Sequence, residues 1–124
     1  MLHSIPIVDD NQSIRRLVRL YVEMSTGWTI HEAENGLEAV ERAREVHPDL
    51  IVLDLSMPVM NGIEAARELK EIMPQIPVII FSEYSNVMSV EEAYNAGISA
   101  QVSKSKPISE LVGTARTLLD HQAA

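Results

Sequence analysis

The sequence predicts an α/β protein with a parallel β-sheet that is covered by helices on both faces. Five short apolar runs alternate with five stretches whose apolar residues recur at helical spacing. One run, Leu50–Leu53, contains no polar residue, as expected of a strand that is buried on both faces. Strands separated by helices run parallel through right-handed crossovers. A chain of 124 residues suits one such unit, so we expect residues 1–124 to form a single domain.

The first half of the chain begins with a strand expected at Ser4–Val8. Pro6 lies inside this strand although proline cannot donate a hydrogen bond to a neighbouring strand. A helix is expected over Gln12–Met24, and Trp28–Ala33 alternates like a second strand. The apolar residues expected to form the buried stripe of the helix are Ile14, Leu17, Leu20, Tyr21 and Met24.

The other elements are bounded by proline, glycine or a polar residue. A helix over Asn35–Val46 stops before Pro48, and the strand Leu50–Asp54 ends in a carboxylate. Pro74 and Gly97 close two later helices. The remaining expected elements are helices at Ile63–Met73, Ser89–Gly97 and Ile108–Asp120, and strands at Pro77–Phe81 and Ser99–Ser103.

Composition limits the classes of partner. The net charge of −8 and the pI near 4.9 argue against binding of nucleic acid or an anionic membrane by this domain. The absence of cysteine excludes disulfides, thiolate metal sites and a cysteine nucleophile, and it fits a cytoplasmic protein. No apolar run approaches the roughly 20 residues that a membrane span needs, and acids appear too early for a signal peptide.

Polar residues stand where the predicted strands end. Because the carboxyl ends of parallel strands lie at the same edge of a sheet, these residues should lie close together. They are Asp9-Asp10, Asp54, Ser82 and Lys104. Singly, each has an ordinary explanation as a helix cap, a turn residue or a surface residue. Three acids in one place repel one another unless a cation joins them, and Mg²⁺ prefers such oxygen ligands. A metal, a lysine and a hydroxyl can hold a phosphoryl group, for which Asp54 would be the nucleophile.

These residues lie in motifs that resemble the CheY-like receiver domain of two-component response regulators. The motifs are "IVDD", "LIVLDLSMPVMNGIEAARELK", "PVIIFS", "AGISAQVSK" and a trailing "EL", in the family's order. The resemblance implies a flavodoxin-like, doubly wound (βα)5 fold with strand order 2-1-3-4-5. It also implies a signalling domain that catalyses only its own phosphorylation and dephosphorylation, and that switches conformation to signal downstream.

Carried over residue by residue, the resemblance makes Asp54 the phosphoacceptor. Ser82 and Lys104 would contact the phosphoryl oxygens; Lys106-Pro107 matches the family's usual dipeptide, but Lys104 has the family's spacing from Gly97. The implied Mg²⁺ ligands are Asp9, Asp10, Asp54 and the backbone carbonyl of Ser56.

The implied partners are a histidine kinase or histidine phosphotransfer protein as donor, and an output domain or downstream effector protein as receiver of the signal. A homodimer formed on phosphorylation is a further expectation. In the family the kinase docks on the first helix, where Val18 and Val22 form either an apolar contact patch or a packing contact with the last helix.

Three positions depart from the family's pattern. The Lys104–Ser105 peptide corresponds to a bond that is commonly cis before proline. Because serine follows here, a cis bond would cost roughly 2.5–4 kcal/mol, and the sequence leaves both cis and trans open. Glu83 places an acid where the family has a small residue. Gln101 replaces the usual aromatic residue, so we expect it to stay outward while Tyr84 takes over the coupling role.

Three other functions deserve comparison. A phosphatase with an aspartate nucleophile would carry a second acid where this chain has Ser56. A flavodoxin-like cofactor binder would need small and hydroxyl residues in place of Asp9-Asp10. A pseudo-receiver, a pure interaction module, would usually lack the acceptor or one of the acids. The sequence therefore favours a phosphorylated receiver.

Overall fold

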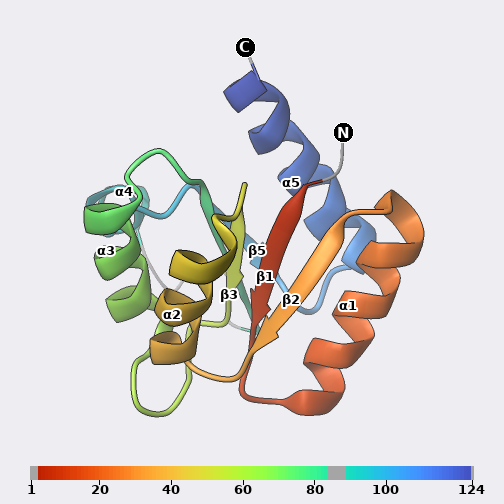
Figure 1. Cartoon of the computed structure of the whole chain (residues 1–124), viewed down its shortest axis with the longest axis horizontal. Helices are drawn as coiled ribbons and strands as arrows, with labels where there is room; N and C mark the ends of the chain where they lie inside the picture. Colours follow the sequence, from red (N-terminus) through yellow and green to blue (C-terminus); the bar gives the residue numbers. More distant parts are fainter. Residues whose placement is uncertain (1–2, 84–88, 124) are drawn as a thin grey trace.

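The computed structural model describes residues 3–83 and 89–123. Within them, five strands alternate with five helices, as the sequence predicted (Figure 1). The strands are β1 Ser4–Val8, β2 Thr29–Ala33, β3 Ile51–Leu53, β4 Val78–Ser82 and β5 Ala100–Ser103. The helices are α1 Gln12–Thr26, α2 Gly36–Val46, α3 Gly62–Ile72, α4 Val90–Asn95 and α5 Ile108–Ala123.

All strands pair in parallel, in the order β2-β1-β3-β4-β5, which confirms the doubly wound topology. Two apolar cores lie on the two faces of the sheet. Residues of α1 and α5 pack in one core, and residues of α2, α3 and α4 pack in the other. Figure 1 shows α2, α3 and α4 grouped on one side of the strands, and α1 on the other. None of the helices in the described ranges is long and apolar enough to cross a membrane.

Helix α1 turns a different side to the sheet from the one predicted. Val18 and Val22 are buried in the same core as Leu111 and Val112 of α5. Of the two alternatives, the packing contact with the last helix is therefore confirmed, and the valines form no docking patch. Of the predicted stripe, only Ile14 packs against this core. Leu17, Leu20, Tyr21 and Met24 are exposed by 60%, 52%, 38% and 86%.

The reason is that apolar residues occupy both sides of α1, so their spacing does not reveal which side is buried. Ion pairs mark the side that faces the sheet. Arg15 and Arg19, four residues apart, both bind Glu32 of β2 and thereby face the sheet edge. This rotation turns Val18 and Val22 inward and leaves the larger apolar residues in solvent.

Pro6 fits within β1 because the pairing of β1 with β3 begins only after Pro6, at Ile7. Ser4 and Val8 turn their carbonyls toward β3 and the segment before it, where they accept from Asp49 N at 2.9 Å and Asp54 N at 2.8 Å. Alternation along a strand puts the nitrogen of Pro6 on that same side. There the pairing with β3 comprises only Ile7 and Val8, so no bond of the ladder depends on an N–H at Pro6.

Candidate functional site

The carboxyl ends of β1, β3, β4 and β5 deliver the predicted site residues to one cavity of about 230 Å³. Asp9 follows β1, Asp54 follows β3, Ser82 ends β4, and Lys104 follows β5. The structure thus brings together every residue that the sequence singled out for the site. The residues that line the cavity are Asp9, Asp10, Asn11, Ile14, Asp54, Ser56, Ser82, Glu83 and Lys104.

Lys104 lies between two acids. Its Nζ is 2.5 Å from Asp9 Oδ2 and 3.5 Å from Asp54 Oδ1. Backbone N–H groups hold the other contacts of these carboxylates: Asn11 N donates to Asp9 Oδ1 and Leu55 N donates to Asp54 Oδ1, each at 2.9 Å. Asp9 and Asp54 are both buried, so their carboxylates are held in place before any ligand arrives.

Charge is unevenly balanced in this cavity. Burial raises the pKa of Asp54, and repulsion from Asp9 adds to this effect, while attraction to Lys104 opposes it. Burial lowers the pKa of Lys104, but its bond to Asp9 and its attraction to both carboxylates outweigh burial, so the pKa is raised. One ammonium therefore lines the cavity together with four carboxylates, those of Asp9, Asp10, Asp54 and Glu83, and a further cation would relieve the repulsion that remains.

The acids are close enough to share that cation. Asp9, Asp10 and Asp54 each offer an oxygen, and these oxygens all lie within 4.8 Å of one another. Two of the acids are buried, and Asp10 is exposed, which leaves an open side for water. A hard, partly hydrated cation such as Mg²⁺ fits this set of donors. Ser56 lines the same cavity.

Backbone contacts fix the position of Lys104 at the cavity. Lys104 N donates to Ser82 O at 2.8 Å, which joins the ends of β5 and β4. Lys106, the alternative in the sequence, is exposed and does not line the cavity.

The bond between Lys104 and Ser105 is trans, because no peptide bond in the described residues is cis. Ser105 has an N–H that proline lacks, and it donates to Ser103 Oγ at 3.1 Å. The trans turn thus satisfies a donor that the family's usual proline does not carry.

The start of α3 packs directly on the backbone of Asp54. Gly62 N donates to Leu55 O at 3.0 Å, and Asn61 and Glu64 form a capping box. A Cβ at Gly62 would lie 2.2 Å from Asp54 O, so the close approach requires glycine. This contact fixes the turn that carries Asp54.

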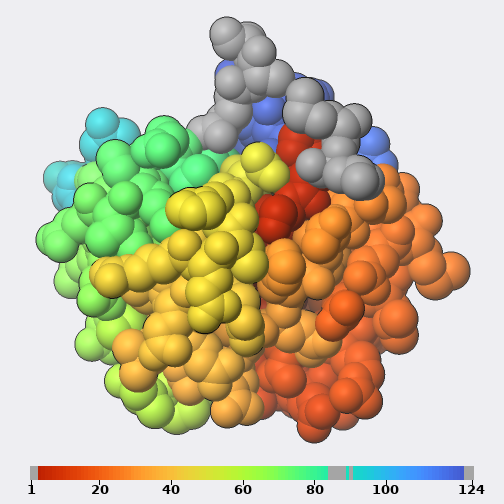
Figure 2. Space-filling model, viewed as in Figure 1, coloured from red at the N-terminus to blue at the C-terminus, as the bar shows by residue number. Residues whose placement is uncertain are grey.

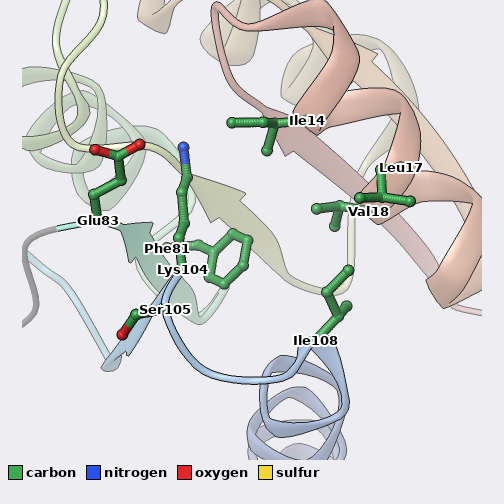
Figure 3. Close-up of a pocket in the computed structure, with 8 residues that line it drawn as sticks. All are labelled: Ile14, Leu17, Val18, Phe81, Glu83, Lys104, Ser105 and Ile108. Carbon is green, nitrogen blue, oxygen red and sulfur yellow. The ribbon is translucent and has the colours of Figure 1, made fainter.

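A second cavity, of about 480 Å³ and mainly apolar, adjoins the first between α1 and the start of α5. Figure 3 shows the side chains of Glu83 and Lys104 on one side of this cavity and those of Ile14, Leu17 and Val18 of α1 on the other. Glu83 and Lys104 line both cavities. This cavity could not be predicted from the sequence, because it depends on the rotation of α1.

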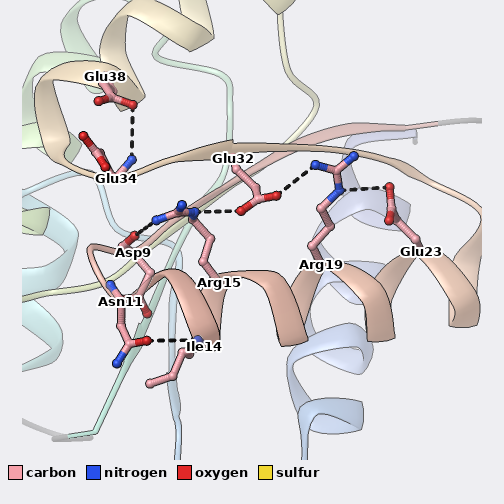
Figure 4. Close-up of polar contacts among 9 residues, drawn as sticks. All are labelled: Asp9, Asn11, Ile14, Arg15, Arg19, Glu23, Glu32, Glu34 and Glu38. Atoms are coloured by element: carbon pink, nitrogen blue, oxygen red, sulfur yellow. Dashed lines mark hydrogen bonds and ion pairs between the residues drawn. The ribbon is translucent and has the colours of Figure 1, made fainter.

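Sequence reasoning also missed Arg15 and Glu32. Arg15 donates from Nη1 to the backbone oxygen of Asp9 at 2.7 Å and from Nε to Glu32 Oε1 at 2.8 Å (Figure 4). The signal was present as an arginine one turn into α1 and an acid in β2, but their pairing depends on tertiary structure. Gln101 is half-buried, and its behaviour on activation stays a prediction; Tyr84 lies outside the described residues.

Comparison with known proteins gives a consistent result. Residues 5–116 match the model of the response regulator receiver domain. The chain is 34% identical to the polar-differentiation response regulator DivK of Brucella ovis, over 96% of this chain and 98% of that protein. It is 33% identical to a putative transcriptional regulator of Pseudomonas aeruginosa, over 95% of this chain. It spans only 57% of that regulator's length and 24% of the length of the regulatory protein AtoC of Escherichia coli.

Two solved structures are similar over nearly the whole chain. A two-component response regulator of the LuxR family from Aurantimonas sp. SI85-9A1 has a TM-score of 0.90 and 31% identity, over 98% of this chain and 87% of that one. The response regulator TrrA from Thermotoga maritima, solved in complex with Mg(2+)-BeF, has a TM-score of 0.86 and 30% identity, over 94% of this chain and 99% of that one.

Proposed function

The chain belongs to the response regulator receiver domain family of two-component signalling, and on this premise we propose that Asp54 is its phosphoacceptor. The donor would be the phosphohistidine of a histidine kinase or of a histidine phosphotransfer protein. The observation that carries the proposal is the placement of Asp54. Its side chain is buried, its Oδ1 lies 3.5 Å from Lys104 Nζ, and one of its oxygens lies within 4.8 Å of oxygens of Asp9 and Asp10. A carboxylate in such a place can attack phosphorus and is poorly placed for a purely structural role.

The proposed reaction is an in-line transfer of a phosphoryl group from the donor's histidine to Asp54. An oxygen of Asp54 forms a bond to phosphorus while the bond from phosphorus to the donor's imidazole nitrogen breaks, and that nitrogen keeps the electron pair. Asp9, Asp10, Asp54 and the carbonyl of Ser56 would hold Mg²⁺, which neutralises charge on the transferred oxygens when it is bound. Lys104 and Ser82, at the same cavity, would bind the phosphoryl oxygens. The domain would thus catalyse its own phosphorylation and dephosphorylation.

The proposed switch follows from the new negative charge. Lys104 is tied to Asp9 in the present structure, so a phosphoryl group on Asp54 would draw the ammonium away from that partner. Lys104 N and Ser82 O join β5 to β4. Movement at either residue would therefore reach the ends of both strands and the helices that follow them.

The donor protein would dock beside the cavity. The second cavity and the exposed Leu17 of α1 form an apolar surface next to Lys104, suited to the apolar side of a helix. An output domain or an effector protein would receive the signal, and phosphorylation would favour a homodimer. Since the Pseudomonas aeruginosa regulator and AtoC extend beyond the region shared with this chain, an output domain is part of the proposal. A cytoplasmic location, suggested by the lack of cysteine, belongs to it as well.

Incubation with acetyl phosphate and Mg²⁺ tests the proposal. Mass spectrometry should find one phosphoryl group per chain, on the peptide that contains Asp54, and a chelator added beforehand should prevent its incorporation. A chain that stays unlabelled by acetyl phosphate and by phosphohistidine donors would contradict the proposed function and favour a pseudo-receiver.

A further inference from the structure

We propose that Arg15 is a positioning residue for the metal-binding turn, and that Glu32 orients it. The inference rests on the proposed Mg²⁺ site at Asp9 and Asp10. Arg15 lines neither of the two cavities beside Lys104. Its guanidinium instead binds the backbone of Asp9, on the side away from the carboxylate.

The first step in the argument is that Asp9 is fixed at every polar atom. Its N donates to Ala33 O at 3.1 Å, its carbonyl accepts from Arg15 at 2.7 Å, and its two carboxylate oxygens accept from Asn11 N and from Lys104. Asp9 is only 3% exposed. If Lys104 releases its oxygen when a metal binds, the contacts through the backbone and Asn11 still hold the residue.

The second step is that Arg15 is itself held rigidly. Its side chain is 12% exposed, and Nε binds Glu32 Oε1 while Nη1 binds Asp9. A guanidinium that uses two nitrogens in a fixed plane has little freedom to turn. Glu32 lies next to Ala33 in β2, and Ala33 accepts from Asp9 N. The arginine thus closes a ring of contacts that joins α1, β1 and β2 at the turn.

The third step is that the outer part of the network does not reach the turn. Arg19 binds Glu32 Oε2 at 2.9 Å and Glu23 at 3.3 Å, and it is 40% exposed. The two arginines share an acid and a helix, but only Arg15 contacts Asp9 (Figure 4). They therefore provide a matched pair for an experiment.

The sign of the effect separates positioning from charge. Arg15→Met removes a positive charge near a cation site, so if its role were only electrostatic, Mg²⁺ would bind more tightly. If Arg15 positions Asp9 and Asp10, Mg²⁺ binds more weakly. Groups that orient metal ligands change metal affinity by about 10-fold or more when they are lost.

The test measures the Mg²⁺ concentration that half-saturates the amide shifts of Asp10 and Asn11 in NMR spectra of the whole chain. We expect Arg15→Met to raise it about 10-fold and Arg19→Met to leave it near the wild-type value. The rate of labelling by acetyl phosphate should approach that of the wild type at saturating Mg²⁺, because no ligand has been removed. A loss of general stability alone would not produce this split.

An unchanged or lowered half-saturating concentration in Arg15→Met overturns the inference, and so does an equal rise in both variants. If Arg15→Met does not fold, Arg15→Lys keeps the charge without the two-nitrogen contact, and it should also weaken Mg²⁺ binding. If the wild-type protein is labelled and every variant binds Mg²⁺ as well as the wild type does, the inference alone is refuted. Wild-type protein that binds no Mg²⁺ and takes no label refutes the proposed function, and the inference with it.

Discussion

The ammonium of Lys104 lies closer to Asp9 than to Asp54, at 2.5 Å against 3.5 Å. The lysine therefore occupies one of the two carboxylate oxygens through which Asp9 could bind a metal. Both side chains are largely buried, at 12% and 4% exposure, so water screens their attraction only weakly. We therefore expect Lys104 and Mg²⁺ to compete for Asp9.

This competition predicts that Lys104→Met binds Mg²⁺ more tightly. A hydrogen bond to a charged group is worth about 1.5–3 kcal/mol, and its removal should tighten binding roughly 10- to 100-fold. Titration calorimetry of wild type and variant measures the difference. Lys106→Met, which removes an exposed lysine two residues away, should change nothing. Weaker binding in Lys104→Met would mean that the lysine helps to hold the site open.

Asp54→Asn should abolish labelling by acetyl phosphate and by phosphohistidine donors. The amide has nearly the same shape, so the far-UV circular dichroism should not change. Its oxygen is a poor nucleophile, and the carboxylate charge is lost. Mass spectrometry after incubation provides the measurement. Labelling at the wild-type rate would show that another residue is the acceptor.

Asp10→Ala should remove most Mg²⁺ binding without a large loss of stability. Asp10 is exposed, so no buried group loses its partner when the carboxylate is deleted. Two carboxylates would remain, and Lys104 already engages both of them. Calorimetry with Mg²⁺, together with thermal unfolding, separates the two effects. Wild-type affinity in this variant would rule out the proposed set of ligands.

Glu83→Ala should speed labelling by acetyl phosphate. Glu83 is exposed and lines the cavity that holds Asp54, where its charge repels a small anionic donor. The gain should be larger at low salt, because salt screens exposed charges. Labelling rates at two ionic strengths check this, with Glu110→Ala as an exposed acid outside the cavity. Equal rates in wild type and variant at low salt would mean that Glu83 points away from the donor's path.

Gly62→Ala should lower the free energy of unfolding by about 1–3 kcal/mol, as overpacking of a tight site does. Its Cβ would lie 2.2 Å from Asp54 O. The nearest atoms all belong to the backbone of Asp54 and Leu55, which cannot move aside as a flexible side chain could. Gly113→Ala, in α5, meets no atom within 4 Å. It should instead stabilise the protein by about 0.5–1 kcal/mol. Urea unfolding of both variants compares them, and equal stabilities would show that the turn at Asp54 can relax.

Strand ends were predictable because an apolar run that stops at a polar residue is a local signal. This signal placed Asp54 and Lys104 at the same edge, and the interval from Gly97 distinguished Lys104 from Lys106. Parallel pairing then brought the acids together, as the cluster of oxygens within 4.8 Å shows.

The rotation of α1 was not predictable in the same way. Leu17 and Val18 are adjacent and equally apolar in pattern, yet one is exposed and the other is buried. The buried side is marked by ion pairs of Arg15 and Arg19 with Glu32, which lies 17 and 13 positions further along the chain. The geometry of the Lys104–Ser105 peptide bond was not predictable for another reason. In the family a cis bond at this position usually precedes proline, whereas here Ser105 N donates a hydrogen bond to Ser103 Oγ.

The apolar outer side of α1 also bears on how the protein behaves at high concentration. Leu20 and Met24 are exposed by 52% and 86%, on a side that two copies could bury against each other. The charge of −8 keeps copies apart at neutral pH. That repulsion vanishes near the pI of about 4.9, and precipitation there should begin at this helix. We therefore expect the protein to stay soluble at a pH well above its pI, where the copies repel one another.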